Sequence, residues 1–271
     1  MVTLDFSQRP LIEASELLVH QEQFDDLGYS LVKNFLTEDE CRVLKASMLK
    51  ATENYEPIEG VERSFLDRYQ MHDLINQDLN YARLLEDPRL DQLIAPHLGP
   101  SWIMYATTSS AVPPHGTNYA NRIHVDAPRF SSDFTFNVGV LWVLDDYTLD
   151  NGAVRVLAGS HRSAAAPSEE YFDQHAQPVV CERGSLIFLH PRIWHRAGAN
   201  TTDHWRCSMT MNACRSFMKQ RMDWVRFLRP EIVTELNEQG RRLIGFDTRL
   251  ATTMEEFFLP EDQRLYKANQ G

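Results

Sequence analysis

Hydrophobic positions at helical spacing dominate the first part of the chain. Between residues 13 and 28, Leu17, Leu18 and Phe24 recur at intervals typical of one helix face, and Gly28 fits a C-terminal stop. This pattern predicts a helix that packs one face on a core and exposes the other.

The next segments alternate between strand-like and helical patterns. Residues 29–33 alternate like a short strand, and Thr37 with Glu40 fits a capping box at the start of a second helix. Residues 52–70 show no period and are expected to form a loop. A further helix is predicted over 77–98, interrupted near Asp87-Pro88.

From residue 101 onward the pattern changes to short runs rich in β-branched and aromatic residues. Turn-forming residues separate these runs, which is typical of a sandwich or jelly roll and not of an alternating βαβ fold. The predicted strands cover 102–105, 134–138, 140–144, 154–157, 185–189 and 207–211. We expect a mainly β protein with flanking α-helices.

The chain is interpreted as one domain of 271 residues. We expect a largely helical N-terminal part over 1–100, a jelly-roll core over 101–214 and a helical C-terminal extension over 215–271. No internal repeat, low-complexity tract or long linker divides it.

Composition and charge restrict the partners. A net charge of −11 argues against nucleic acid or an anionic membrane surface. The N-terminus lacks signal-peptide features, no apolar run reaches the roughly 20 residues of a membrane span, and the four cysteines show no zinc spacing. We expect a cytoplasmic protein with reduced thiols that binds a small-molecule substrate, with a homodimer left open.

His124-Val125-Asp126 is the first candidate for chemistry. On a strand, residues two apart share a face, so His124 and Asp126 can reach one metal ion. Two histidines and one carboxylate form the facial triad that holds non-haem Fe(II). The third ligand must come from a neighbouring strand, and His190 and His195 are the best-placed candidates.

Arg206 and Ser208 form the second candidate. An arginine fork pairs strongly with the distal carboxylate of a dicarboxylic cosubstrate, and a hydroxyl two residues on shares its strand face. Residues near the metal strand that are candidates for substrate contact are Tyr105, His115, Asn121 and Arg122.

These motifs together resemble the phytanoyl-CoA dioxygenase family of Fe(II)/2-oxoglutarate-dependent oxygenases. The resemblance is carried by residues 24–36, 124–126, 150–153, 158–162 and 190–200, and by Arg206. It implies a double-stranded β-helix (cupin-like) core and His195 as the third metal ligand. It also implies that Arg206 binds 2-oxoglutarate and that Trp142 lines the cosubstrate pocket.

The implied activity is hydroxylation of an unactivated C–H bond of a small metabolite, with release of succinate and CO₂. Fe(II), 2-oxoglutarate and O₂ would be required, with ascorbate as the reductant in vitro. The same ligands serve desaturation, epimerisation or cyclisation, whereas Asp126 occupies the position that halogenases leave open for chloride. The alternatives are a cupin-like metal protein that does not use 2-oxoglutarate and a β-sandwich binding protein.

Overall fold

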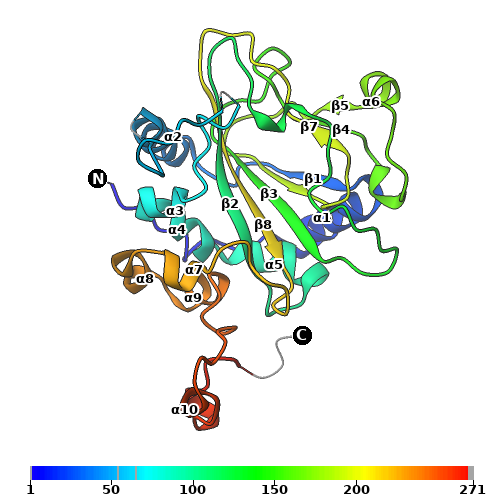
Figure 1. The fold of residues 1–271 in the computed structure, drawn as a ribbon. Helices are drawn as coiled ribbons and strands as arrows, with labels where there is room; N and C mark the ends of the chain where they lie inside the picture. The colour runs from blue at the N-terminus through cyan, green and yellow to red at the C-terminus, as the bar shows by residue number, and fades with distance from the viewer. Residues whose placement is uncertain (1, 54, 65, 268–271) are drawn as a thin grey trace.

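Two antiparallel β-sheets form the centre of the computed structural model, which describes residues 2–53, 55–64 and 66–267 (Figure 1). The larger sheet has the strand order β1-β6-β3-β8-β2, and the smaller one has the order β5-β4-β7. The strands are β1 (Tyr29–Val32), β2 (Ile103–Val112), β3 (Asn137–Val143), β4 (Arg155–Val156), β5 (Gln177–Pro178), β6 (Leu186–Leu189), β7 (His195–Arg196) and β8 (Arg206–Cys214).

Helices surround the sheets, mostly before β2 and after β8 in sequence. They are α1 (Ala14–Leu27), α2 (Glu38–Glu53), α3 (Leu74–Gln77), α4 (Leu79–Arg83), α5 (Pro88–Leu98), α6 (Glu169–His175), α7 (Trp224–Phe227), α8 (Pro230–Glu235), α9 (Glu238–Leu243) and α10 (Met254–Phe257). Four short 3₁₀ segments complete the described elements: η1 (Leu84–Glu86), η2 (Tyr119–Asn121), η3 (Ser160–Arg162) and η4 (Glu261–Gln263).

Strand β8 shows how the fold separates a core face from a functional face. Cys207, Met209 and Met211 belong to the main hydrophobic core, which the large sheet shares with the helices. Arg206 and Ser208 alternate with them and therefore point to the opposite face, towards the smaller sheet. A second core lies on that face and includes residues of β3, β4 and β6. This is the jelly-roll arrangement that the strand pattern predicts.

Several local predictions are confirmed. Helix α1 and strand β1 occupy the expected segments. The capping box forms as predicted, because the Thr37 amide donates to Glu40 Oε2 at 2.8 Å and the Glu40 amide donates to Thr37 Oγ1 at 3.3 Å. Gly28 ends α1 with a φ of 82°, a conformation that glycine adopts without steric penalty.

Other local predictions are wrong in detail. The helix expected over 77–98 is interrupted at Asp87-Pro88, as predicted, because Asp87 leaves the helical conformation and caps α5. Its first part is shorter than expected, since α4 begins only after its cap Asp78 and continues into the 3₁₀ segment η1. Strand β3 begins only at Asn137 and continues through Gly139, so the two predicted runs form one strand.

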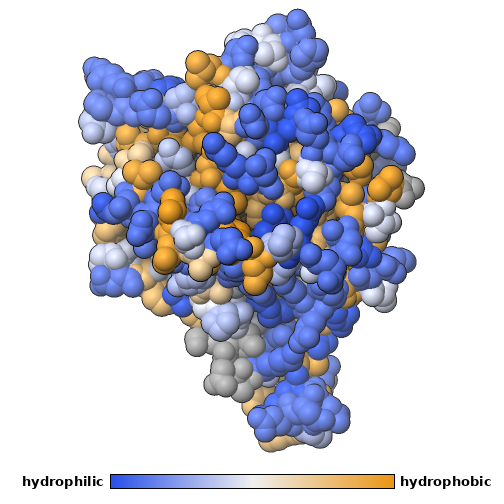
Figure 2. Space-filling view, turned by 180° about the vertical axis from the view of Figure 1, so that it is seen from behind, coloured by the Kyte–Doolittle hydropathy of each residue, from blue (hydrophilic) through white to orange (hydrophobic). Residues whose placement is uncertain are grey.

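The C-terminal part becomes helical later than the pattern suggests. Phe217, expected at a helical position, precedes the first helix of this part, α7, and its ring stacks on Phe134 with 6.4 Å between the centroids. Tertiary packing of two loops thus replaces helix formation there. Further on, α10 projects away from the body in both views (Figures 1 and 2), with Phe257 64% and Phe258 72% exposed. None of the described helices is long and apolar enough to cross a membrane.

Three histidines lie around Phe24 at the junction of α1, α5 and the large sheet. The ring centroid of His97 lies 4.3 Å from that of Phe24, and the centroid of His190 lies 5.4 Å from it. His161 is tilted against His190, with 4.8 Å between the centroids. Burial, reinforced by the charges that the other two imidazoles would carry, lowers the pKa of His190 to about 3. Burial also lowers the pKa values of His97 and His161. The fold therefore requires these imidazoles in their neutral form.

This cluster predicts acid sensitivity. A histidine of the unfolded chain titrates near pH 6.5, so below that pH the unfolded state binds a proton that folded His190 does not bind. The free energy of unfolding should fall as the pH decreases from 7 towards 3, by roughly 2 kcal/mol at pH 5 from His190 alone. Urea unfolding at pH 7 and pH 5 measures this loss.

Two matched variants test whether His190 causes this loss of stability at low pH. The His190→Asn variant keeps an acceptor for the Arg192 amide, which donates to His190 Nδ1, but cannot take up the proton. It should lose less stability between pH 7 and pH 5 than the wild type. His175→Asn at the exposed end of α6 is the control and should behave like the wild type. Equal losses in the two variants would contradict the assignment.

Candidate metal centre

His124, Asp126 and His195 converge in the structure. One ligand atom from each residue lies within 4.8 Å of the others. Asp126 Oδ1 lies 3.7 Å from His124 Nε2 and 3.8 Å from His195 Nε2. Among the residues that the structure describes, these three side chains form a group close enough together to bind a single metal ion.

A pair of reciprocal backbone hydrogen bonds brings the two histidines together. The His124 amide donates to the His195 carbonyl and the His195 amide donates to the His124 carbonyl, both at 3.0 Å. The His124–Asp126 segment is not a regular strand, contrary to expectation, since His124 forms only this isolated bridge. The side chains of His124 and Asp126 nevertheless lie on the same side of this segment, as the prediction from strand alternation required.

Backbone carbonyls set the orientation of both imidazoles. His124 Nδ1 lies 2.8 Å from the Arg122 carbonyl, and His195 Nδ1 lies 3.0 Å from the Ile193 carbonyl. A carbonyl only accepts, so each Nδ1 carries the proton and each Nε2 keeps its lone pair for a metal. Burial, followed by the neighbouring His195, lowers the pKa of His124, which favours the neutral, metal-binding form.

Gly139 of β3 leaves room for the carboxylate. A Cβ atom at this position would lie 3.4 Å from Asp126 Oδ2, at the short end of ordinary van der Waals contact, so the carboxylate lies directly against the backbone of β3. The donor set of two imidazole nitrogens and one carboxylate oxygen suits Fe(II), which would keep open positions for other ligands. The residues therefore fit the metal that the sequence motif implies.

Arg206 lies buried on the inner face of the large sheet, with 2% of its surface exposed. Its guanidinium donates to the Tyr147 hydroxyl at 3.0 Å, to Ser208 Oγ at 3.2 Å and to the Gly152 carbonyl at 3.2 Å. All of these partners are neutral, and its buried Nε has no partner within the described chain. Because a buried charge is costly without a counter-charge, this group is prepared for an anion.

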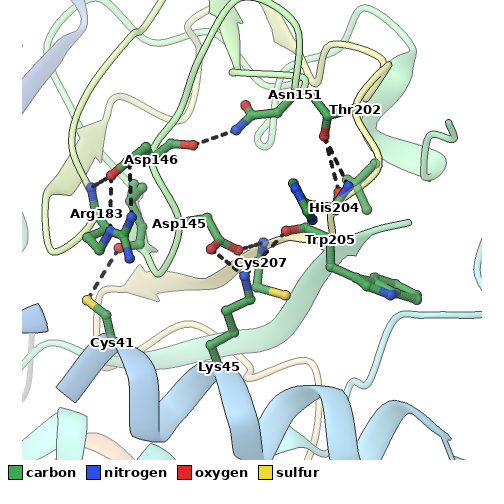
Figure 3. A network of polar contacts seen from close by, with 12 residues as sticks. Cys41, Lys45, Asp145, Asp146, Asn151, Arg183, Thr202, His204, Trp205 and Cys207 are labelled. Carbon is green, nitrogen blue, oxygen red and sulfur yellow. Dashed lines mark hydrogen bonds and ion pairs between the residues drawn. The ribbon is translucent and has the colours of Figure 1, made fainter. Parts of the chain in front are cut away.

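A polar network fixes the start of β8 (Figure 3). Asp145 forms an ion pair with Lys45 of α2 and accepts a hydrogen bond from the Cys207 amide at 2.8 Å. Lys45 also reaches the Trp205 carbonyl at 3.5 Å. The residues before and after Arg206 are thereby linked to α2. The backbone that carries the guanidinium is therefore fixed by contacts on the helix side of the large sheet.

Trp142 and His190 are not brought to this cluster. Trp142 is fully buried in the main core, on the helix-facing side of β3, because strand alternation places it opposite to the side of Gly139. His190 belongs to the histidine cluster around Phe24. Of the two histidines considered for the third ligand position, only His195 joins His124 and Asp126.

The four residues suggested for substrate contact are spread over the metal-side loops and β2. His115 is exposed and pairs with Asp203 at 2.7 Å. Asn121 and Arg122 are exposed at the end of η2, two to three residues before His124. Tyr105 lies at a bulge in β2, where its carbonyl accepts from the Arg221 amide. Tyr147, which contacts Arg206, was not predicted, since no sequence motif marks it.

A cavity of about 590 Å³ lies elsewhere, between α2 and the segment 55–69. Its wall includes Tyr69 and Trp205, whose rings meet edge to face at 4.9 Å. The Trp205 side chain packs against the main hydrophobic core, and none of the residues that line this cavity belongs to the metal cluster.

The jelly roll, this metal cluster and a match to a family model together identify the class of the protein as the non-haem Fe/2-oxoglutarate-dependent oxygenases. The chain belongs to the phytanoyl-CoA dioxygenase family, whose family model, "Phytanoyl-CoA dioxygenase (PhyH)", matches residues 24–208. It is 29% identical to "Uncharacterized protein Mb1539" of Mycobacterium bovis over 258 residues, which cover 93% of this chain and 94% of the relative.

Solved structures share the fold. EvdMO1 superposes with a TM-score of 0.61 at 20% identity, covering 73% of this chain and 50% of EvdMO1. The epimerase SnoN, solved in complex with Fe³⁺, alpha ketoglutarate and nogalamycin RO, gives a TM-score of 0.58 at 18% identity, covering 74% of this chain and 84% of SnoN.

The geometry predicts that Asp126→Ala weakens metal binding by at least about 100-fold, because even the loss of a group that only supports a ligand costs 10- to 100-fold. Calorimetric titration with Ni²⁺ measures the affinity. Asp133→Ala, which removes an exposed carboxylate from the loop after Asp126, should bind Ni²⁺ like the wild type. Unchanged affinity in Asp126→Ala would place the metal elsewhere.

Proposed function

We propose that the protein hydroxylates an unactivated C–H bond of a small-molecule metabolite, using 2-oxoglutarate and O₂ as cosubstrates and releasing succinate and CO₂. His124, Asp126 and His195 would hold Fe(II). The iron, when bound, supplies the oxygen activation and C–H oxidation of this enzyme class. The protein contributes ligand geometry, cosubstrate orientation and substrate placement.

The observation that carries the proposal is the buried, uncompensated Arg206. Its contacts with Tyr147 and Ser208 hold the guanidinium in place, and the Tyr147 hydroxyl donates to Ser208 Oγ at 2.8 Å. A dicarboxylic acid supplies the missing counter-charge through its distal carboxylate, in the bidentate geometry that arginine favours. A metal-binding protein without such a cosubstrate would have no need for a buried cation at this place.

Desaturation, epimerisation and cyclisation need the same iron ligands as hydroxylation. Analysis of the product by mass separates these outcomes, because only hydroxylation adds one atom from isotopically labelled O₂. Asp126 completes the triad and leaves no halide position, which disfavours halogenation, and hydroxylation is the outcome that we propose. Succinate formed in air, in proportion to the oxidised product, is the assay that tests the proposal.

Replacing Arg206 by glutamine should raise the 2-oxoglutarate concentration needed for half-maximal succinate release by about 100-fold, since a charge-assisted bidentate contact is lost. The Ni²⁺ affinity should remain unchanged, because the metal ligands are intact. Arg155→Gln removes a guanidinium that pairs with Asp173 and serves as the control. A 2-oxoglutarate dependence equal to that of the wild type would favour a metal protein that does not use this cosubstrate.

A further inference from the structure

A buried amide oxygen without a hydrogen-bond partner lies on the same face of the large sheet as the metal cluster. Asn212 of β8 is paired with Gly139, whose missing Cβ would lie 3.4 Å from Asp126 Oδ2, so the Asn212 side chain shares the face of the carboxylate ligand. Its Oδ1 is buried without a partner among the described residues. The same holds for Oε1 of Gln70, a residue with 1% of its surface exposed. Buried acceptors of this kind are rare unless a ligand or water serves them.

Tyr119 connects Gln70 to the metal cluster. The Tyr119 amide donates to the Leu66 carbonyl at 3.2 Å, which ties the loop that precedes Gln70 to the segment leading to His124. The Gln70 side chain lies near the Tyr119 phenol, where it opposes the rise in the pKa of Tyr119. Burial raises the pKa of Tyr119 and the Asp126 carboxylate raises it further, so the phenol lies close enough to Asp126 to sense its charge.

Two arginines face the same phenol. The guanidinium groups of Arg221 and Arg122 oppose the rise in the pKa of Tyr119. Arg122 lies two residues before His124, and its carbonyl accepts a hydrogen bond from His124 Nδ1 at 2.8 Å. The Arg221 amide donates to the Tyr105 carbonyl at 3.1 Å, which anchors this segment to β2. Within the part of the chain that the structure describes, neither side chain has an ion pair or hydrogen-bond partner. The hydrogen bond to the Tyr105 carbonyl places Arg221 beside Asn212, because Ala106, which follows Tyr105 in β2, is paired with Asn212 of β8. Both arginine side chains are exposed.

We propose that Arg122 and Arg221, together with Asn212 and Gln70 beside Tyr119, form the subsite that selects the substrate: an organic carboxylate that also carries a hydrogen-bond donor such as a hydroxyl or an amide N–H. The guanidinium groups bind the carboxylate, and the amide oxygens accept from the donor. A phosphate would bring a second negative charge close to Asp126, which disfavours it. This inference rests on the proposed function, because it assigns the substrate of the same site.

Four compounds test the two recognition elements separately: 3-phenylpropanoate, 3-hydroxy-3-phenylpropanoate and the methyl ester of each. Binding is measured by calorimetry and by thermal shift with protein loaded with Ni²⁺ and 2-oxoglutarate, so that no turnover occurs. Each acid should bind at least about tenfold more tightly than its ester, since the ester loses a charge-assisted contact. The hydroxy acid should bind more tightly than the acid without the hydroxyl.

Variants assign the two preferences to residues. Arg221→Gln and Arg122→Gln should each lower the ratio of acid to ester affinity by about tenfold, and Asn212→Leu should remove the preference for the hydroxyl. Arg226→Gln, which removes an equal charge from an arginine paired with Asp223, should change neither ratio. Circular dichroism verifies that each variant is folded.

The outcomes separate this inference from the function on which it rests. Acids and esters with equal affinity, absent binding of all four compounds, or ratios that survive in Arg221→Gln and Arg122→Gln overturn the subsite. If 2-oxoglutarate still binds to the Ni²⁺ protein in that case, the proposed function stands and only the substrate class is wrong. If 2-oxoglutarate itself does not bind, the proposed function fails.

Discussion

The reciprocal backbone pairing of His124 with His195 is the constraint on which the site depends. These residues are distant in sequence, yet two hydrogen bonds of 3.0 Å fix their separation and orientation. Each imidazole then donates Nδ1–H to a carbonyl of its own segment, which leaves both Nε2 atoms facing Asp126. Backbone hydrogen bonds therefore organise the two histidine ligands, so part of the entropic cost of assembling the ligand set is included in the folding of the chain.

The large sheet also holds the buried positive charge of Arg206 in position to bind an anion. The strand of this residue alternates between hydrophobic residues facing the helices and polar residues facing the small sheet, so one strand serves both the main core and the site. The Lys45–Asp145 ion pair holds the adjoining backbone from the helix side. A guanidinium fixed in this way loses little freedom when an anion binds, which is the physical basis of preorganised recognition.

The sequence predicted the fold class and the pairs His124–Asp126 and Arg206–Ser208, because period-two alternation and residue chemistry are local properties. Choosing His195 over His190 required the family resemblance, since both follow the same strand. The two wrong predictions have the same cause, because tertiary contacts decide both positions. Trp142, assigned by resemblance, faces the helices from its strand, and Phe217, assigned to a helix by periodicity, stacks on Phe134. Tyr147 and Gln70 act through contacts distant in sequence, which no local pattern marks.

The arrangement of charge around the metal cluster follows a consistent physical logic. An acidic chain disfavours the approach of anions, so the guanidinium groups on the functional face must act at short range, where Coulomb attraction exceeds the screened repulsion of distant carboxylates. Arg206 lies deep and has neutral partners, whereas Arg122 and Arg221 are exposed. In the proposed assignment, depth distinguishes the two anions: the buried arginine suits the cosubstrate, and the exposed pair suits a substrate that binds from solvent.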